Sequence, residues 1–93
     1  MILKKQFIKR SIILEPAAFE SLISLGKIDR KLLEKVMNLI QVCMKSPFEG
    51  IGKPEALKGN LKGYWSRRIN DEHRLIYKVE KDKIIIVSCK DHY

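Results

Sequence analysis

The sequence has few of the residues that mark secreted or metal-binding proteins. Its 93 residues include two cysteines, three prolines, five glycines and one tryptophan. Cys43 and Cys89 form no C-x-x-C pair, and no histidine stands at a metal-ligand spacing from either of them. We therefore expect two buried, reduced thiols, with no metal and no cofactor.

Long apolar runs are also missing from the sequence. None reaches the roughly 18 residues that a membrane-spanning helix needs. Residues 1–14 mix basic and apolar side chains, but they lack the continuous apolar core and the small-residue cleavage site of a signal peptide. We expect a cytoplasmic protein with no membrane partner. The length predicts one domain over residues 1–93, with residues 1–10 as a basic N-terminal extension.

Acidic residues are outnumbered, with 11 against 19 basic residues and a net charge of +8. The basic excess lies at both ends: residues 1–10 carry four basic and no acidic residues, and residues 53–93 carry ten basic and six acidic ones. Such an excess favours a polyanionic partner, such as a nucleic acid, an anionic membrane or an acidic protein. Charge that serves solubility alone would look the same in the composition.

The periodicity of apolar residues predicts helices first and strands later. Pro16 suits a first helical turn, Gly26 a helix end, and Asp29 the cap of a second, strongly amphipathic helix that stops at Ser46-Pro47. The glycine- and proline-rich residues 46–60 predict an ordered loop or turn. The predicted strands are residues 11–14, 63–70, 73–80 and 83–90, and the apolar side of the first helix is predicted as Phe19, Leu22, Ile23 and Leu25.

This order of elements predicts an α+β fold. Its simplest packing places two N-terminal helices on one face of a small antiparallel β-sheet. The other face is then free to bind a partner.

Arginines in the middle of the predicted strands are the first candidates for that surface. Arg68 would share a face with Tyr64 and Ser66, and Arg74 would lie on the next strand. A central arginine must reach water, a carboxylate or a ligand. On this pattern, a solvated face with ion pairs and a phosphate-binding face are equally good interpretations.

Glu55 and the two histidines complete the candidates for chemistry. His73 has apolar neighbours on its face and fits a structural role, and His92-Tyr93 taken alone would be an ordinary chain end. If the loop that carries Glu55 folds over the sheet, a carboxylate, two arginines and a histidine would meet. Such a set suffices for metal-free RNA cleavage, with one group as base, one as acid and arginines on the phosphate.

Several motifs in the second half of the chain resemble a known family. They are P-F-E-G-x-G-K-P-E-x-L-K from Pro47, then G-Y-W-S-R-R-I from Gly63, then E-H-R-L-x-Y from Glu72, and a final H-Y. Together they resemble the Txe/YoeB toxins of type II toxin–antitoxin modules, in the RelE/ParE superfamily. The match is dense over the last half of the chain and looser over the helical pair.

The resemblance implies a RelE/ParE-like fold and a ribosome-dependent, metal-independent endoribonuclease that cuts mRNA in the ribosomal A site and so inhibits translation. It implies Glu55 as general base, His92 as general acid, Arg74 as stabiliser of the phosphate and Tyr93 as an orienting group. Basic positions expected to contact RNA are Arg68, Lys58, Arg67 and Lys53. It also implies a cognate antitoxin of the YefM/Axe kind and a homodimer.

Two departures and two rival functions stay open. Family members usually start near Ile12, so residues 1–10 are an added strand, a ribosome- or RNA-binding arm, or the product of a start codon assigned too early. The tryptophans expected around the first helix are missing. A ParE-like relative directed at DNA gyrase, or a protein that binds RNA or ribosomes without cutting, are the alternatives to the nuclease.

Overall fold

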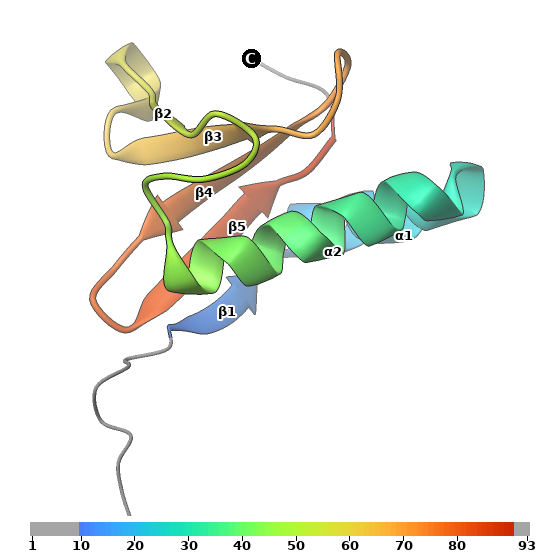
Figure 1. Cartoon of the computed structure of the whole chain (residues 1–93), viewed down its shortest axis with the longest axis horizontal. Coiled ribbons are helices and arrows are strands. Elements are labelled where there is room, and N and C mark those ends of the chain that lie inside the picture. Colours follow the sequence, from blue (N-terminus) through green and yellow to red (C-terminus); the bar gives the residue numbers. More distant parts are fainter. Residues whose placement is uncertain (1–9, 91–93) are drawn as a thin grey trace, which may run out of the picture.

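Two helices cover one face of a five-stranded sheet in the computed structural model, which describes residues 10–90 (Figure 1). The strand order is β1-β5-β4-β3-β2, and all neighbours are antiparallel except β1 and β5. The elements are β1 (Ser11–Leu14), α1 (Pro16–Ile28), α2 (Arg30–Lys45), β2 (Glu55–Ala56), the 3-10 turn η2 (Gly59–Leu61), β3 (Tyr64–Arg68), β4 (Arg74–Val79) and β5 (Lys83–Ser88).

The two helices begin and end largely where the capping residues predict. Pro16 opens α1, and the Asp29 carboxylate accepts a hydrogen bond from the Leu32 amide at 3.1 Å at the start of α2. The prediction that Gly26 ends the first helix was wrong, because α1 continues to Ile28 and the Asp29 amide donates to the Leu25 carbonyl. A Cβ at position 26 would lie 2.9 Å from a methyl carbon of Leu33, so Gly26 allows α1 and α2 to approach closely.

The buried side of α1 differs in part from the prediction. Leu22 and Leu25 are buried as expected, and Ala18 joins them at 0% exposure. Phe19 and Ile23 were expected in the core but are 55% and 46% exposed. Each follows a buried residue by one position, which turns its side chain about 100° away from the sheet around the helix axis.

The antiparallel pairing predicted from the sequence is confirmed for β3, β4 and β5, but β1 makes the sheet a mixed one. The first strand runs parallel to the last, with Ser11 opposite Lys83 and Leu14 opposite Ile86. The segment predicted as loop also contributes a strand, because Glu55 and Ala56 pair with Ser66 and Trp65 of β3. Two paired residues give too short a run for an alternating pattern to appear in the sequence. The predicted strands at 11–14, 63–70, 73–80 and 83–90 all exist, most of them shorter than expected.

The core lies between the helices and the side of the sheet that faces them. Its members come from α1, α2, β4 and β5, together with Ile69 and Cys89, which directly follow β3 and β5, and both cysteines are among them. Cys43 and Cys89 are free thiols at 0% exposure, as the sequence predicted. Burial raises the pKa of both thiols, that of Cys89 to about 11, so both stay protonated near neutral pH.

Arg67 is buried at the edge of this core and is wholly engaged in hydrogen bonds. Its Nε donates to the Tyr77 hydroxyl at 3.2 Å, Nη1 donates to the Ile51 carbonyl at 2.7 Å, and Nη2 donates to the carbonyls of Ser46 and Glu49. The Tyr77 hydroxyl donates in turn to the Pro47 carbonyl at 2.7 Å. Burial raises the pKa of Tyr77 to about 12, which keeps this donor proton in place. One guanidinium thus fixes the chain between α2 and β2 against the sheet.

We predict that Arg67→Met lowers the free energy of unfolding by at least about 3 kcal/mol, because it leaves the buried Tyr77 hydroxyl and three partly buried carbonyl groups without the hydrogen bonds that Arg67 donates. Chemical denaturation with urea measures the change. Arg68→Met is the matched control and should cost less than about 1 kcal/mol, since Arg68 has an exposed ion pair. Equal losses for the two variants would contradict the assigned role of Arg67.

Candidate functional site

The face of the sheet away from the helices carries those candidate site residues of β2, β3 and β4 that lie on one side. Side chains of residues that pair across strands lie on the same face. Arg68 pairs with Arg74, Ser66 pairs with Ile76 and with Glu55, and Tyr64 pairs with Lys78. The Lys78 amine lies 5.9 Å from the centre of the Tyr64 ring, in agreement with this assignment. Glu55, Arg68 and Arg74 therefore point to one side of the sheet.

Two arginines directly opposite each other are the main electrostatic feature of this face. Like charges at opposed positions of an antiparallel pair destabilise a sheet. Arg68 forms an ion pair with Asp71, which lies in the turn after β3. Arg74 is half-buried, and within residues 10–90 it has no ion pair or side-chain hydrogen bond. A bound anion between the two guanidinium groups would turn this repulsion into attraction.

Glu55 reaches the same face by a route that the sequence did not indicate. The sequence suggested a loop folding over the sheet, but Glu55 extends the sheet as part of β2. Its position opposite Ser66 makes Arg68 a diagonal neighbour, at roughly 7–8 Å between backbones. Glu55 is exposed, and its carboxylate has no ion pair within residues 10–90.

The other predicted RNA-contacting residues divide into surface and buried positions. Lys53 and Lys58 are exposed on either side of β2, and Lys53 has a positive φ of 48°. Arg67 was predicted to contact RNA, and this was wrong: its exposure is 0% and its donors are occupied by carbonyls and Tyr77. Trp65 and Ile69, two residues to either side, are apolar, so strand alternation already placed Arg67 on the inner face.

Of the two histidines, only His73 lies within the described residues. His73 is buried at 8% exposure, and its carbonyl accepts the Ile69 amide at 3.0 Å, which agrees with a structural role in the turn before β4. Asn70 supports the same turn by accepting the amides of Glu72 and His73. His92 and Tyr93 lie outside the described residues. Their expected roles stay predictions.

Sequence reasoning missed two charged residues that border this site. Asp71 holds Arg68, and Lys35 of α2 lines a hollow that also contains Lys53 and Arg68. Lys35 is far from these residues in the sequence, and a lysine on an amphipathic helix gives no signal beyond solvation. Only the fold brings it to the site. Residues 10–90 contain no cluster of three or more His, Cys, Asp or Glu that would suit a metal ion.

The chain belongs to a known family of toxins. Its fold is that of the small α+β toxins of bacterial toxin–antitoxin systems. The model of the YoeB-like toxin family of bacterial type II toxin–antitoxin systems matches residues 14–93, and the chain is a member of that family. Within residues 10–90, neither helix is both long and apolar enough to pass through a bilayer.

Relatives support the assignment over almost the whole chain. A toxin YoeB of Mycobacterium bovis is 44% identical over 84 residues, which cover 90% of this chain and 99% of that protein. The structure of a YoeB dimer from Staphylococcus aureus matches with a TM-score of 0.84 at 46% identity, over 91% of this chain and 99% of that one. A heterotetrameric YoeB–YefM toxin–antitoxin complex from S. aureus matches with a TM-score of 0.81 at 46% identity and the same coverage.

We predict that inorganic phosphate at millimolar concentration stabilises the protein through the Arg68–Arg74 pair. Thermal unfolding at constant ionic strength, with chloride replaced by phosphate, should show a rise in Tm that follows ligand linkage. Arg74→Gln should lose most of this rise, and in phosphate-free buffer its Tm should equal or exceed that of the wild type, since the variant removes a repulsion. Lys81→Gln, in the exposed turn between β4 and β5, should keep the full rise. If Arg74→Gln responds to phosphate as the wild type does, the pair is not an anion site.

Proposed function

We propose that this toxin is a ribosome-dependent mRNA endoribonuclease that cuts in the ribosomal A site and thereby inhibits translation. The observation that carries the proposal is the opposed pair Arg68 and Arg74 on the helix-free face, with the Glu55 carboxylate on the adjacent strand. A cationic pair suits a phosphodiester, and a neighbouring carboxylate suits the removal of a proton. The family resemblance assigns the same residues to these tasks.

The proposed reaction is an acid–base transesterification within the RNA backbone. Glu55 takes the proton of the ribose 2′-hydroxyl, and the 2′-oxygen attacks the adjacent phosphorus. Arg74, aided by Arg68, stabilises the charge that develops on the phosphoryl oxygens. The bond from phosphorus to the 5′-oxygen breaks, and His92 protonates the leaving oxygen while Tyr93 orients the group. The products are a 2′,3′-cyclic phosphate, or a 3′-phosphate after hydrolysis, and a 5′-hydroxyl.

The partners follow from the relatives and from the charge of the chain. The S. aureus relatives form a dimer and a heterotetramer with the antitoxin YefM. We infer that this toxin also forms a homodimer and is bound by a YefM-like antitoxin. Its net charge of +8 suits an acidic antitoxin segment and the RNA of a ribosome. The cytoplasm is the compartment in which these partners meet.

Cleavage of mRNA on programmed ribosomes tests the proposal. The wild type should release a fragment ending at the A-site codon, and both Glu55→Gln and His92→Gln should cut at least about 100-fold more slowly, because each lacks one proton-transfer group. Lys81→Gln is the control and should cut at the wild-type rate. A wild type that never cuts, or two variants that cut as fast as the wild type, would refute the nuclease.

The same samples separate the rival functions. Intact mRNA together with blocked translation would identify a protein that binds RNA or ribosomes without cutting. Loss of DNA supercoiling in a gyrase assay would identify a ParE-like target. Neither result is expected.

We predict that removal of His92 and Tyr93 alone strongly slows cleavage and leaves the fold intact. The truncated chain keeps every core residue found within residues 10–90, of which Cys89 is the last, so its Tm should stay within a few degrees of the wild type. Its cleavage rate should fall by about 10²–10⁴-fold, as expected for the loss of a general acid. Should the truncated chain be unstable, His92→Gln in the full chain answers the same question. Normal cleavage by the truncated, folded chain would show that neither residue takes part.

A further inference from the structure

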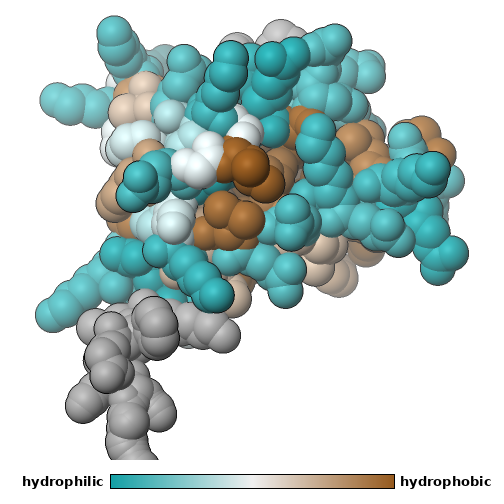
Figure 2. All heavy atoms as spheres, viewed as in Figure 1, coloured by the Kyte–Doolittle hydropathy of each residue, from teal (hydrophilic) through white to brown (hydrophobic). Residues whose placement is uncertain are grey.

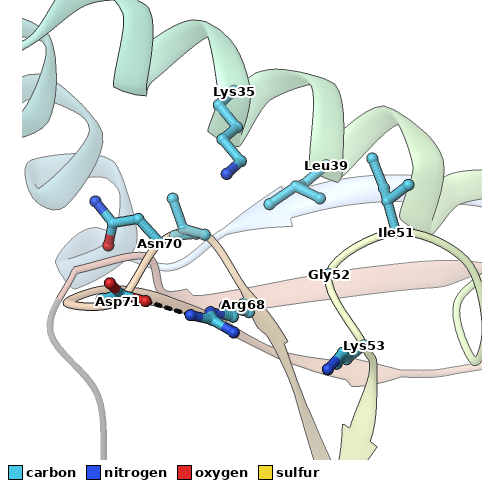
Figure 3. A pocket seen from close by; sticks show the side chains of 9 residues that line it. Lys35, Leu39, Ile51, Gly52, Lys53, Arg68, Asn70 and Asp71 are labelled. Atoms are coloured by element: carbon cyan, nitrogen blue, oxygen red, sulfur yellow. Dashed lines mark hydrogen bonds and ion pairs between the residues drawn. The ribbon is translucent and has the colours of Figure 1, made fainter.

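A hollow of about 620 Å³ lies beside the candidate active face, between α2 and the loop that precedes β2 (Figure 3). Its walls include Lys35 and Leu39 from α2, Ile51 and Lys53 from the loop, and Arg68 and Asp71 at the end of β3. The volume falls in the range of about 300–1,000 Å³ that is usual for sites of small molecules. It is large enough for one nucleotide.

The charges around the hollow favour an anion. Lys35, Lys53 and Arg68 face a single acid, Asp71, which leaves a net charge of +2. Lys35 extends from α2 toward the hollow, and Lys53 lies across from it (Figure 3). Within residues 10–90 neither lysine forms an ion pair. Cations gathered around one cavity repel each other, and a phosphate group relieves this repulsion.

Apolar side chains form part of the lining of the hollow. Leu39 and Ile69 line it but are only 1% and 0% exposed, so among these three apolar residues Ile51, at 53% exposure, is the one that presents surface to a ligand. In the view of Figure 2, a hydrophobic area near the middle of the molecule lies between α2 and this loop, with hydrophilic side chains around it. Such a surface suits a ribose or a base next to a phosphate.

Gly52 fixes the distance between the loop and β3. Its carbonyl accepts the Arg68 amide at 2.6 Å, and its φ is +88°. A Cβ at this position would lie 3.1 Å from the Arg68 carbonyl oxygen and 3.2 Å from the Arg67 Cβ. Because the loop is held by its backbone, the hollow exists before any ligand binds, which lowers the entropic cost of binding.

We propose that this hollow binds one nucleotide of single-stranded RNA, with its phosphate between Lys35 and Lys53. Arg68 belongs both to the hollow and to the Arg68–Arg74 pair, so one RNA strand can place consecutive phosphates at the two positions. The proposal rests on the proposed nuclease function in that the strand is the same substrate. It adds a binding subsite and a contact residue, Lys35, that lie outside the reacting centre.

The test measures binding without cleavage. A fluorescent, 2′-O-methylated RNA oligonucleotide cannot be cut, because its 2′-oxygen has no proton. Its affinity is measured by fluorescence anisotropy over a range of salt concentrations, for the wild type and for Lys35→Gln/Lys53→Gln. Loss of both cations that hold this phosphate should weaken binding on the order of tenfold near 0.1 M salt and should lower the slope of log K against log salt by about 0.7.

A matched control carries the same loss of charge elsewhere. Lys27 and Lys81 are exposed residues in the last turn of α1 and in the turn between β4 and β5. Lys27→Gln/Lys81→Gln should retain most of the affinity and the slope of the wild type. All four lysines are exposed, so both double variants should unfold at temperatures close to that of the wild type. Equal RNA binding by the two double variants would overturn the proposal.

Two further measurements identify which molecule supplies the anion that binds in the hollow. In an NMR titration, the oligonucleotide should shift the amides of Lys35, Lys53 and Asn70 more strongly than inorganic phosphate at equal concentration. Equal shifts with unchanged RNA affinity of the double variant would indicate a site for free phosphate and would overturn the RNA subsite. A double variant that loses affinity only for an acidic antitoxin peptide would overturn it as well.

Failure of this subsite and failure of the nuclease give different results. A wild type that cuts mRNA while Lys35→Gln/Lys53→Gln binds RNA normally refutes the subsite alone. A wild type that binds the oligonucleotide through the two lysines but never cuts refutes the nuclease alone.

Discussion

The hydrogen bonds that the buried Arg67 guanidinium donates are the interactions on which the position of the candidate site depends. It gathers the carbonyls of Ser46, Glu49 and Ile51 from the segment that leaves α2, and it anchors them to Tyr77 in the centre of the sheet. That segment leads directly into β2, which carries Glu55. An arginine is suited to this task because its planar fork has five donors and keeps its charge at any physiological pH. A loop without regular structure thereby obtains a defined position.

The adjacent residue, Arg68, is used in the opposite way. Its side chain lies on the outer face, opposite Arg74, and its only described acidic partner is the exposed Asp71. The two neighbouring arginines therefore affect stability in opposite ways. Arg67 stabilises the protein, whereas Arg68 repels Arg74, and an anionic ligand can offset this repulsion. Such a division is common where binding sites retain local repulsion in the free protein.

Much of the fold could be predicted from local signals. The amphipathic pattern of α2, its Asp29 cap and the first-turn Pro16 all correspond to the structure. The features that were mispredicted depend on distant partners: the parallel pairing of β1 with β5, the two-residue strand at Glu55, and the use of Gly26 for helix contact. None of these has a local sequence pattern. The candidate site also divides into local and distant signals. Sequence motifs indicated Glu55, Arg68 and Arg74, whereas Lys35 reaches the site only through the packing of α2.

The pairing of the first strand with the last has a consequence for synthesis of the toxin. Within residues 10–90, β1 has one strand partner, and that partner is β5. A nascent chain therefore carries β1 unpaired until almost all of the described sequence has been made, and contacts of such long separation form late in folding. The sheet that would present Glu55 and the arginines is then complete only after β5, the last described strand, has been made.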